Sequence, residues 1–205
     1  MVRTEEVIRF FDRLAPEWDA GMVRNEDVIE KILDNAEVSE GKDILDVACG
    51  TGVLIPDYLK RGVSSVTAID ISPRMAEIAK AKFDLPNVTI LCGDAEKMEP
   101  GRQFDCIVVY NAFPHFADRE GLIRHLVPLL RSGGMLTVAH GMSREKINAH
   151  HQGTSDSVSQ GLMPADELAA IFGKYLKVAA VISDESMYQV AGKSEIRNRK
   201  SEMLL

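Results

Sequence analysis

The sequence predicts an α/β fold in which a doubly wound, mostly parallel sheet is covered by helices on both faces. Short apolar runs alternate along the chain with segments of helical periodicity, and acidic residues recur where the apolar runs end. In addition, the apolar run over residues 43–47 leads directly into a tight turn that contains Gly50 and Gly52. Sheets of this class bind ligands at the carboxyl ends of their strands, so this turn marks the expected site.

Two amphipathic helices are predicted ahead of the sheet, over residues 4–14 and 23–35. Apolar residues recur at helical spacing in both, which provides each helix with one face to bury. The first face carries Val7, Ile8, Phe11 and Leu14, and the second carries Val28, Ile29, Ile32 and Leu33. Because neither segment belongs to the alternation of strands and helices, we expect residues 1–40 to form a helical cap.

The alternation itself predicts the core. A helix over residues 53–60 follows the glycine turn, and strand-like runs recur at 65–69, 88–91 and 104–109. Ser72 followed by Pro73 is a helix-start signal, so we expect a helix after the second strand.

The glycine turn distinguishes between two classes of cofactor site. A dinucleotide site needs a third small residue three positions after the second glycine, so that the helix packs on the strand and its N-terminus holds a pyrophosphate. Ile55 stands at that position. Asp46, just before the turn, repels phosphates but accepts a hydrogen bond from an ammonium group. The turn therefore predicts a cofactor without phosphate.

Residues 46–52, which read Asp-Val-Ala-Cys-Gly-Thr-Gly, resemble the first motif of the class I S-adenosylmethionine (SAM) dependent methyltransferases. Four further segments follow in the order of that family, and the last of them, residues 129–138, resembles its glycine turn and fifth strand. The resemblance covers residues 40–140. It implies a Rossmann-like, doubly wound sheet of seven mostly parallel strands, with SAM as the cofactor of a methyltransferase. The motifs are specific for fold and cofactor, and they say little about the methyl acceptor.

The resemblance also implies which residues hold the cofactor. They are Asp46, Ala48, Gly50 and Gly52 at the methionine end, Asp70 and Ile71 at the ribose and adenine, Asp94 and Ala95 at the adenine edge, and Asn111 beneath the sulfonium. One carboxylate at the end of the second strand can accept hydrogen bonds from both ribose hydroxyls, which suits Asp70. Taken alone, Asp70 also fits the start of a helix, and Asp94 fits a turn.

Residues 10–19 resemble the entry segment of methyltransferases of the menaquinone and ubiquinone type, which folds over the cofactor as a lid. Methyl transfer requires that water be excluded around a sulfonium, and a mobile aromatic cap can do this. We therefore place Trp18 among the substrate-binding candidates. The alternative is a helix that only covers the edge of the sheet.

The acceptor is expected to bind after the fifth strand. Ser143 can cap a helix on which Arg144, Asn148 and His151 share one face, at positions i, i+4 and i+7. This face predicts a polar wall for an acidic or hydrogen-bonding substrate, and a solvated face is the alternative. Residues 152–163 are predicted to form a flexible loop before a helix that starts at Pro164.

Two histidines are candidates for a catalytic base, which is needed only where the acceptor bears a proton. His115 follows the fourth strand and is the leading candidate, and His140 ends the fifth. The alternative is that they are a pocket-wall and a strand-end histidine. A metal site built from His140, His150 and His151 is disfavoured, because adjacent side chains on a helix point about 100° apart. We expect no metal.

Composition predicts one globular domain. The chain has 205 residues, of which 45% are hydrophobic and 27% charged, which is ordinary for a single core. We divide it into the cap (1–40), the SAM-binding core (41–140), an acceptor-side helix with a loop and the last strands (141–192), and a tail (193–205). The tail either is disordered or packs on a second subunit in a homodimer.

Charge and apolar content limit the location and the partners. The first residues lack the apolar core of a signal peptide, and no apolar run approaches the roughly 18 residues of a membrane span. A cytoplasmic protein that contacts no membrane is therefore expected. Cys49, Cys92 and Cys106 lie in or beside predicted buried strands and are expected to be reduced. A formal charge of -7 argues against a nucleic acid partner.

The predicted function is methyl transfer from SAM to a small molecule, with oxygen, sulfur and nitrogen acceptors in falling order. The segment Asn111-Ala112-Phe113-Pro114 lacks the motif of adenine-amino methyltransferases, which disfavours base methylation. No carboxylate pair follows Tyr110 to hold a cationic amine, so a neutral or anionic acceptor remains. Two alternatives stay open: carbon methylation of a quinone-like ring, and a SAM-binding module without turnover.

Overall fold

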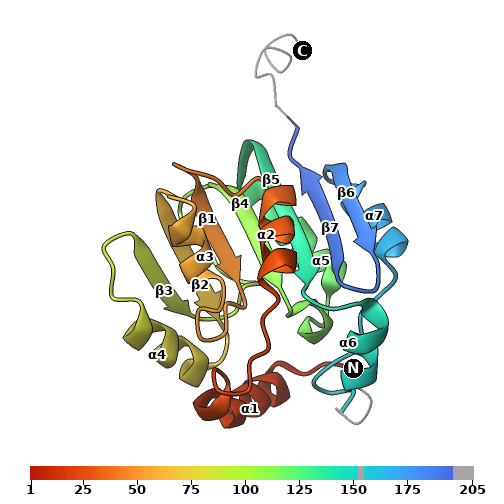
Figure 1. Ribbon diagram of the computed structural model, residues 1–205. Coiled ribbons are helices and arrows are strands. Elements are labelled where there is room, and N and C mark those ends of the chain that lie inside the picture. Colours follow the sequence, from red (N-terminus) through yellow and green to blue (C-terminus); the bar gives the residue numbers. More distant parts are fainter. Residues whose placement is uncertain (152–154, 196–205) are drawn as a thin grey trace.

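A seven-stranded sheet forms the centre of the computed structural model, which describes residues 1–151 and 155–195. Its order is β3-β2-β1-β4-β5-β7-β6 (Figure 1). The strands are β1 (Asp43–Val47), β2 (Ser65–Asp70), β3 (Val88–Cys92), β4 (Phe104–Tyr110), β5 (Leu130–His140), β6 (Lys177–Ser183) and β7 (Tyr188–Lys193). The first five are parallel, and β7 runs antiparallel to both of its neighbours. The predicted doubly wound, mostly parallel sheet is confirmed.

Helices cover both faces of the sheet because side chains alternate along each strand. On β1, Leu45 and Val47 belong to an apolar cluster with α5 (Arg119–Leu126) and α7 (Ala165–Phe172). Ile44 points to the other cluster, which contains residues of α2 (Glu26–Asn35), α3 (Ile55–Lys60) and α4 (Pro73–Lys82). Strand order reverses between β1 and β4, so the gap at their carboxyl ends is the expected ligand site.

The first part of the predicted cap lies at that edge of the sheet, whereas α2 packs on a face of the sheet. In Figure 1, α1 (Thr4–Leu14) lies beyond the arrowheads of β1 and β2, next to α4. The N-terminus reaches the neighbourhood of α6 (Arg144–His151), where the Arg3 backbone amide donates to the carbonyl of Ser157 at 2.8 Å. Three short 3-10 helices complete the elements: η1 (Ala15–Glu17), η2 (Phe113–His115) and η3 (Val127–Leu129).

Capping side chains set where the helices start. The hydroxyl of Ser72 accepts from the Met75 amide at 3.2 Å, which confirms the predicted start of α4. The prediction that the second helix starts at Val23 is wrong. Asn25 accepts from the Val28 amide at 3.3 Å, so α2 begins at Glu26 and Val23 stays exposed.

One prediction about the cysteines also needs correction. Cys49 and Cys106 are buried, whereas Cys92 is exposed. The reason is topological, because Cys92 ends β3, which is an edge strand with only β2 as its neighbour. All three thiols are unpaired with one another.

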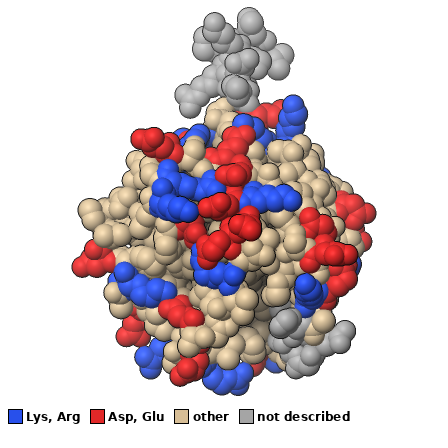
Figure 2. Space-filling view, in the orientation of Figure 1, with Lys and Arg blue, Asp and Glu red and all other residues tan. Residues whose placement is uncertain are grey.

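The outer face over α2 carries charges of both signs. Figure 2 shows acidic and basic side chains intermixed across the centre of this face. Lys60 pairs with Glu30 at 3.1 Å, and Arg61 pairs with Asp34 at 2.7 Å. This face therefore lacks the continuous basic field that a phosphate backbone requires. No described helix combines the length and the apolar character that a membrane span needs.

Candidate cofactor and acceptor site

The turn after β1 adopts backbone conformations that favour glycine. The φ angles are +56° at Ala48, +59° at Gly50 and +83° at Gly52. A Cβ on Gly52 would lie 2.5 Å from the Phe83 ring, so this glycine is required for packing. A Cβ on Gly50 would have only ordinary contacts, the nearest with the indole nitrogen of Trp18 at 3.7 Å. Gly50 therefore presents its backbone to a space that Trp18 covers.

Asp70 joins the end of β2 to this turn. Its carboxylate accepts hydrogen bonds from the backbone amides of Gly50 at 2.7 Å and Ser72 at 2.9 Å. Burial raises the pKa of Asp70, and the two amide hydrogen bonds counter that rise. Each carboxylate oxygen has two lone pairs, so both oxygens can still accept from a diol. The ribose role of Asp70 stays a prediction.

Asp46 is a buried acidic residue just before the turn. Its side chain is 2% exposed, and within residues 1–151 and 155–195 no donor reaches its Oδ2. Burial, together with the charge of Asp70, raises the pKa of Asp46 well above its ordinary value. A buried, unsatisfied carboxyl group is costly unless a donor or a cation joins it. Asp46 therefore suits a ligand that carries an ammonium group.

The remaining cofactor candidates lie along the same edge. Asp94 follows β3, where its Oδ1 accepts from the Glu96 amide at 3.0 Å and its Oδ2 pairs with Lys97 at 2.9 Å. Ala95 beside it is buried, and Ile71 follows Asp70 half-buried. Asn111 has a φ of +53° at the end of β4, and its side-chain oxygen accepts from the Gly141 amide at 3.0 Å. Asn111 thus ties the ends of β4 and β5 together.

Two acidic residues fasten the cap over this edge. Asp12 accepts from the Ser72 hydroxyl at 2.6 Å and from the Arg74 amide at 3.1 Å. Asp19 accepts from the Thr51 hydroxyl at 2.5 Å and pairs with Lys82 at 2.7 Å. Sequence reasoning did not single out either carboxylate. Both lie in residues 10–19, so the resemblance of that segment was the available signal.

Aromatic rings join the cap to the end of β4. The ring of Phe11 lies 4.9 Å from His115, edge to face at 89°, and 5.7 Å from Trp18. His115 Nδ1 is 2.9 Å from the carbonyl oxygen of Val158. A carbonyl only accepts, so Nδ1 is the donor, and in the neutral ring the lone pair is then on Nε2. Phe11 thus contacts both His115 and Trp18, and the lid role of this segment stays a prediction.

His140 is more deeply placed than His115. It ends β5, is 1% exposed, and meets the ring of Tyr188 edge to face with centroids 6.0 Å apart. The metal candidates His150 and His151 have side chains that lie outside the described part of the chain. Among the described residues, no group of three or more His, Cys, Asp or Glu could hold a metal ion.

The polar face of α6 holds a loop. Arg144 Nε donates to the carbonyl of Leu162 at 3.0 Å, and Asn148 exchanges two hydrogen bonds with the backbone of Leu162, at 3.2 and 2.6 Å. Arg144 and Asn148 therefore share a face as predicted, and they position residues 159–162 beside η2. The substrate-binding roles of Arg144, Asn148, His151 and Trp18 stay predictions.

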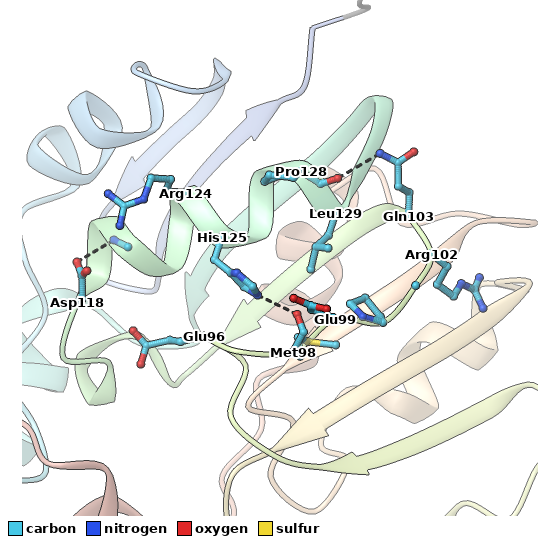
Figure 3. A pocket seen from close by; sticks show the side chains of 13 residues that line it. Glu96, Met98, Glu99, Arg102, Gln103, Asp118, Arg124, His125, Pro128 and Leu129 are labelled. Carbon is cyan, nitrogen blue, oxygen red and sulfur yellow. Dashed lines mark hydrogen bonds between the residues drawn. The ribbon is translucent and has the colours of Figure 1, made fainter.

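A hollow of about 730 Å³ lies on the flank of the sheet, between residues 96–103 and α5 (Figure 3). His125 of α5 lines the hollow and donates from Nε2 to the Met98 carbonyl at 3.0 Å. Both acidic and basic side chains line it, among them Glu96, Asp118 and Arg124. None of the nine cofactor candidates does so, which sets this hollow apart from the edge described above.

Comparison with known proteins agrees with this geometry. Residues 44–134 match the family described as methyltransferase domain. The chain is similar to a malonyl-[acyl-carrier protein] O-methyltransferase of Acetivibrio thermocellus, with 36% identity over 129 residues that cover 62% of this chain and 46% of that protein. It is also similar to a ubiquinone biosynthesis O-methyltransferase of Coxiella burnetii, with 30% identity over 141 residues, or 64% of this chain and 59% of the relative. The chain thus spans about half the length of these relatives.

Solved structures share the fold at low sequence identity. One chain of the complex containing the Haloferax volcanii Trm112 methyltransferase activator superposes with a TM-score of 0.75 at 20% identity, covering 90% of this chain and 97% of that one. The magnesium protoporphyrin IX methyltransferase of Synechocystis PCC 6803, solved with bound SAH, has a TM-score of 0.71 at 15% identity, with 94% and 100% covered. At such identities the likeness concerns the fold.

Proposed function

We propose that this chain transfers a methyl group from SAM to a small-molecule acceptor. Two findings support this: residues 44–134 match the family described as methyltransferase domain, and the fold is shared with a magnesium protoporphyrin IX methyltransferase solved with bound SAH. The acceptor atom we favour is oxygen, since the relatives described above are named O-methyltransferases. Sulfur and nitrogen acceptors follow. The division of the chain into cap, core, acceptor side and tail remains part of the proposal.

The observation that carries this proposal is the buried carboxyl group of Asp46 beside the glycine turn. Among the described residues its Oδ2 has no donor, and its neighbour Asp70 adds a second negative charge. The ammonium group of the methionine end of SAM would neutralise Asp46 and hydrogen bond to it. A phosphate at the same position would be repelled by both carboxylates, which favours SAM over a dinucleotide.

The other cofactor candidates surround Asp46 in an order that suits SAM. Gly50 allows close approach of a ligand to the backbone, and Asp70 can accept hydrogen bonds from the ribose hydroxyls. Asp94 and Ala95 follow β3 and would line the adenine edge. Bound SAM supplies an electrophilic methyl group on its sulfonium, and the protein aligns the acceptor with it.

The cap excludes water in this proposal. Asp12 and Asp19 hold it closed through Ser72 and Thr51, which lie at the carboxyl ends of β2 and β1. Trp18 then covers Gly50. A dry site strengthens the electrostatic interactions within it and prevents hydrolysis of a reactive donor. These three contacts support a lid rather than a helix that only covers the sheet.

His115 is our candidate for the base when the acceptor carries a proton. The Val158 carbonyl orients its ring through Nδ1, which places the basic lone pair on Nε2. His140 is the second candidate, although its depth at the end of β5 suits a structural histidine. For a carboxylate acceptor no base is required, and alignment is the main contribution of the protein.

Two alternatives predict different behaviour. Carbon methylation of a quinone-like ring is not favoured, because the relatives reported above are O-methyltransferases. A SAM-binding module would bind the cofactor tightly without turnover and would be unaffected by removal of His115. A homodimer and a cytoplasmic location remain expectations. One solved neighbour belongs to a complex with an activator protein, which makes a protein partner a further candidate for this chain.

The decisive test is calorimetric titration with S-adenosylhomocysteine (SAH), the product form of the cofactor, with NAD as the control. We expect SAH to bind with micromolar affinity and NAD not to bind. Release of SAH from SAM is then measured with carboxylate, phenol, thiol and amine acceptors. Preference for NAD, or no SAH binding, would contradict the proposal. Full activity in both His115→Ala and His140→Ala at pH 7 would show that neither is the base.

A further inference from the structure

Five arginines of the described chain are half-buried: Arg24, Arg61, Arg119, Arg131 and Arg144. Three of them are neutralised by aspartates, namely Arg24 by Asp57 at 2.9 Å, Arg61 by Asp34 at 2.7 Å and Arg131 by Asp43 and Asp105 at 2.7 and 2.6 Å. Arg119 and Arg144 form no ion pair with any described carboxylate.

Arg119 is held in place while most of its donors stay unused. It begins α5, its guanidinium lies 5.6 Å from the centroid of the Phe113 ring, and one terminal nitrogen donates to the carbonyl of Gly161. Within the described residues its Nε is buried without an acceptor. Burial also lowers the pKa of Arg119, and the nearby Tyr188 counters this only in part. A guanidinium has five N–H donors, so this cation has capacity for a ligand.

Arg144, at the start of α6, contacts the same loop of residues 159–162. Its Nε donates to the carbonyl of Leu162, one residue beyond the carbonyl that Arg119 holds. Both arginines line a hollow of about 470 Å³ between α5, α6 and the start of α7. The two unpaired, half-buried arginines of the described chain thus meet at one cavity, beside the segment that contacts His115.

We propose that this hollow is an anion-binding subsite in which Arg119 and Arg144 bind a carboxylate or phosphate group of the methyl acceptor. Guanidinium groups bind planar carboxylates and tetrahedral phosphates through paired hydrogen bonds. These hydrogen bonds are stronger where the two cations are partly shielded from water. That the anion belongs to the acceptor rests on the proposed function. That an anion binds in this hollow is independent of the proposed function.

Asp156 and Glu167 also line the hollow, and both are exposed. Neither pairs with Arg119 or Arg144 in the described structure. Their charges oppose an approaching anion, although solvent screens charges at an exposed rim. Weak binding of an isolated anion is therefore expected, and removal of one rim charge should strengthen it.

The test uses the full chain and simple probes at constant ionic strength. Malonate and inorganic phosphate are titrated and followed by amide NMR shifts, with malonamide as the neutral analogue of malonate. The variants are Arg119→Gln and Arg144→Gln, and the matched control is Arg124→Gln, an exposed arginine of the same helix that does not line this hollow. Glu167→Gln serves as a variant that should gain affinity.

We expect malonate or phosphate to shift amides of residues 159–162, and malonamide to have no effect. Each hollow variant should weaken anion binding about tenfold, as loss of a charge-assisted hydrogen bond predicts. Arg124→Gln should bind as the original chain does, and Glu167→Gln should bind more tightly. Tighter binding of phosphate than of malonate would identify a phosphate ester as the bound group, and the reverse order a carboxylate.

Unchanged anion affinity in both hollow variants, or equal binding of malonamide and malonate, would overturn the subsite. If either hollow variant fails to fold, unchanged affinity in Glu167→Gln would overturn it as well. SAH is titrated into the same samples. SAH binding without anion binding would overturn this inference alone, and anion binding without SAH binding would overturn the proposed function alone.

Discussion

The carboxylate of Asp70 lies 2.7 Å from the backbone nitrogen of Gly50, so the end of β2 is hydrogen bonded to the turn that follows β1. This contact connects two segments that are expected to hold opposite ends of the cofactor. The same side chain therefore supports the shape of the turn and is also our candidate for binding the ribose hydroxyls. A change at Asp70 should affect cofactor affinity through both effects.

Replacement of Asp70 by alanine should weaken SAH binding at least tenfold. Loss of charge-assisted hydrogen bonds to a diol costs about 1.5–3 kcal/mol. Titration calorimetry measures the affinity, and Asp84→Asn, at an exposed position, is the control. An affinity within about twofold of the original would refute the ribose assignment, since that corresponds to less than about 0.5 kcal/mol.

Replacement of Asp46 by asparagine should raise the stability of the free protein and lower its affinity for SAH. Burial, with the charge of Asp70, raises the pKa of Asp46, so the folded state holds this proton more tightly than the unfolded chain does. The contribution of this group to the stability of the folded state is largest at low pH, where Asp46 is protonated. This contribution falls as the pH rises from about 4, the ordinary pKa of an aspartate, through the raised pKa of Asp46. Asparagine is similar in shape and removes the charge.

The checks for Asp46→Asn are urea denaturation of the free protein and SAH calorimetry, both at pH 7. The stability gain should shrink at pH 4, where the original carboxyl group is protonated. A variant that loses stability and keeps full SAH affinity would contradict the ammonium role of Asp46.

Emission from Trp18 should report cofactor binding. Trp18 is the single tryptophan of the chain, and its indole nitrogen lies 3.7 Å from the position of a Cβ on Gly50. We expect SAH to shift its fluorescence and NAD to leave it unchanged. Thr51→Val, which removes the 2.5 Å hydrogen bond to Asp19, should loosen the cap and weaken the response. If calorimetry detects SAH binding and the emission stays constant, the cap does not cover the cofactor.

Gly52→Ala should destabilise the fold more than Gly133→Ala does. Both glycines have positive φ angles, +83° and +77°, so alanine costs about 1–2 kcal/mol of backbone strain at either position. A Cβ on Gly52 would also lie 2.5 Å from Phe83, whereas nothing lies within 4 Å at Gly133. Overpacking adds about 1–3 kcal/mol at Gly52 alone. Chemical denaturation of the two variants measures the difference, and equal losses would contradict it.

Asp43→Asn should lower stability at neutral pH and have little effect in acid. Burial would raise the pKa of Asp43, but hydrogen bonds from Ser65, Arg131 and Arg102 outweigh it and lower the pKa to about 2. A lowered pKa contributes stability above the unfolded value near 4, and this is lost as pH falls toward 2. Urea denaturation at pH 7, 4 and 3 should show the gap to the original chain narrowing. The exposed Asp156→Asn is the control.

Local signals in the sequence predicted most of the elements. The first helix spans Thr4–Leu14 as its periodicity indicates, and β2, β3 and β4 each start where their apolar runs start. Helix α2 starts later than periodicity suggests, because the side chain of Asn25 ends the preceding extended segment. Cys92 is exposed because strand order, which no local pattern encodes, places β3 at an edge.

The cofactor candidates were also visible in the sequence, since each lies within a short motif at the end of a strand. The long-range hydrogen bonds that hold the segments around the site together were not visible in the sequence. Asp12 meets Ser72 across 60 positions, Asp19 meets Thr51 across 32, and Arg119 meets Gly161 across 42. Periodicity and motif spacing describe neighbours along the chain, and these pairs are neighbours only in space.

The sequence by itself determined the α/β alternation, the glycine turn and the acidic strand ends, because these depend on residue type and short spacing. Only the tertiary structure decided that Trp18 lies beside Gly50, that Asp46 Oδ2 has no donor among the described residues, and that Arg119 and Arg144 meet at one hollow. Burial and the pairing of charges depend on how distant segments pack. Burial and charge pairing are fixed only when the sheet and its helices assemble, and together they determine the chemistry of the site.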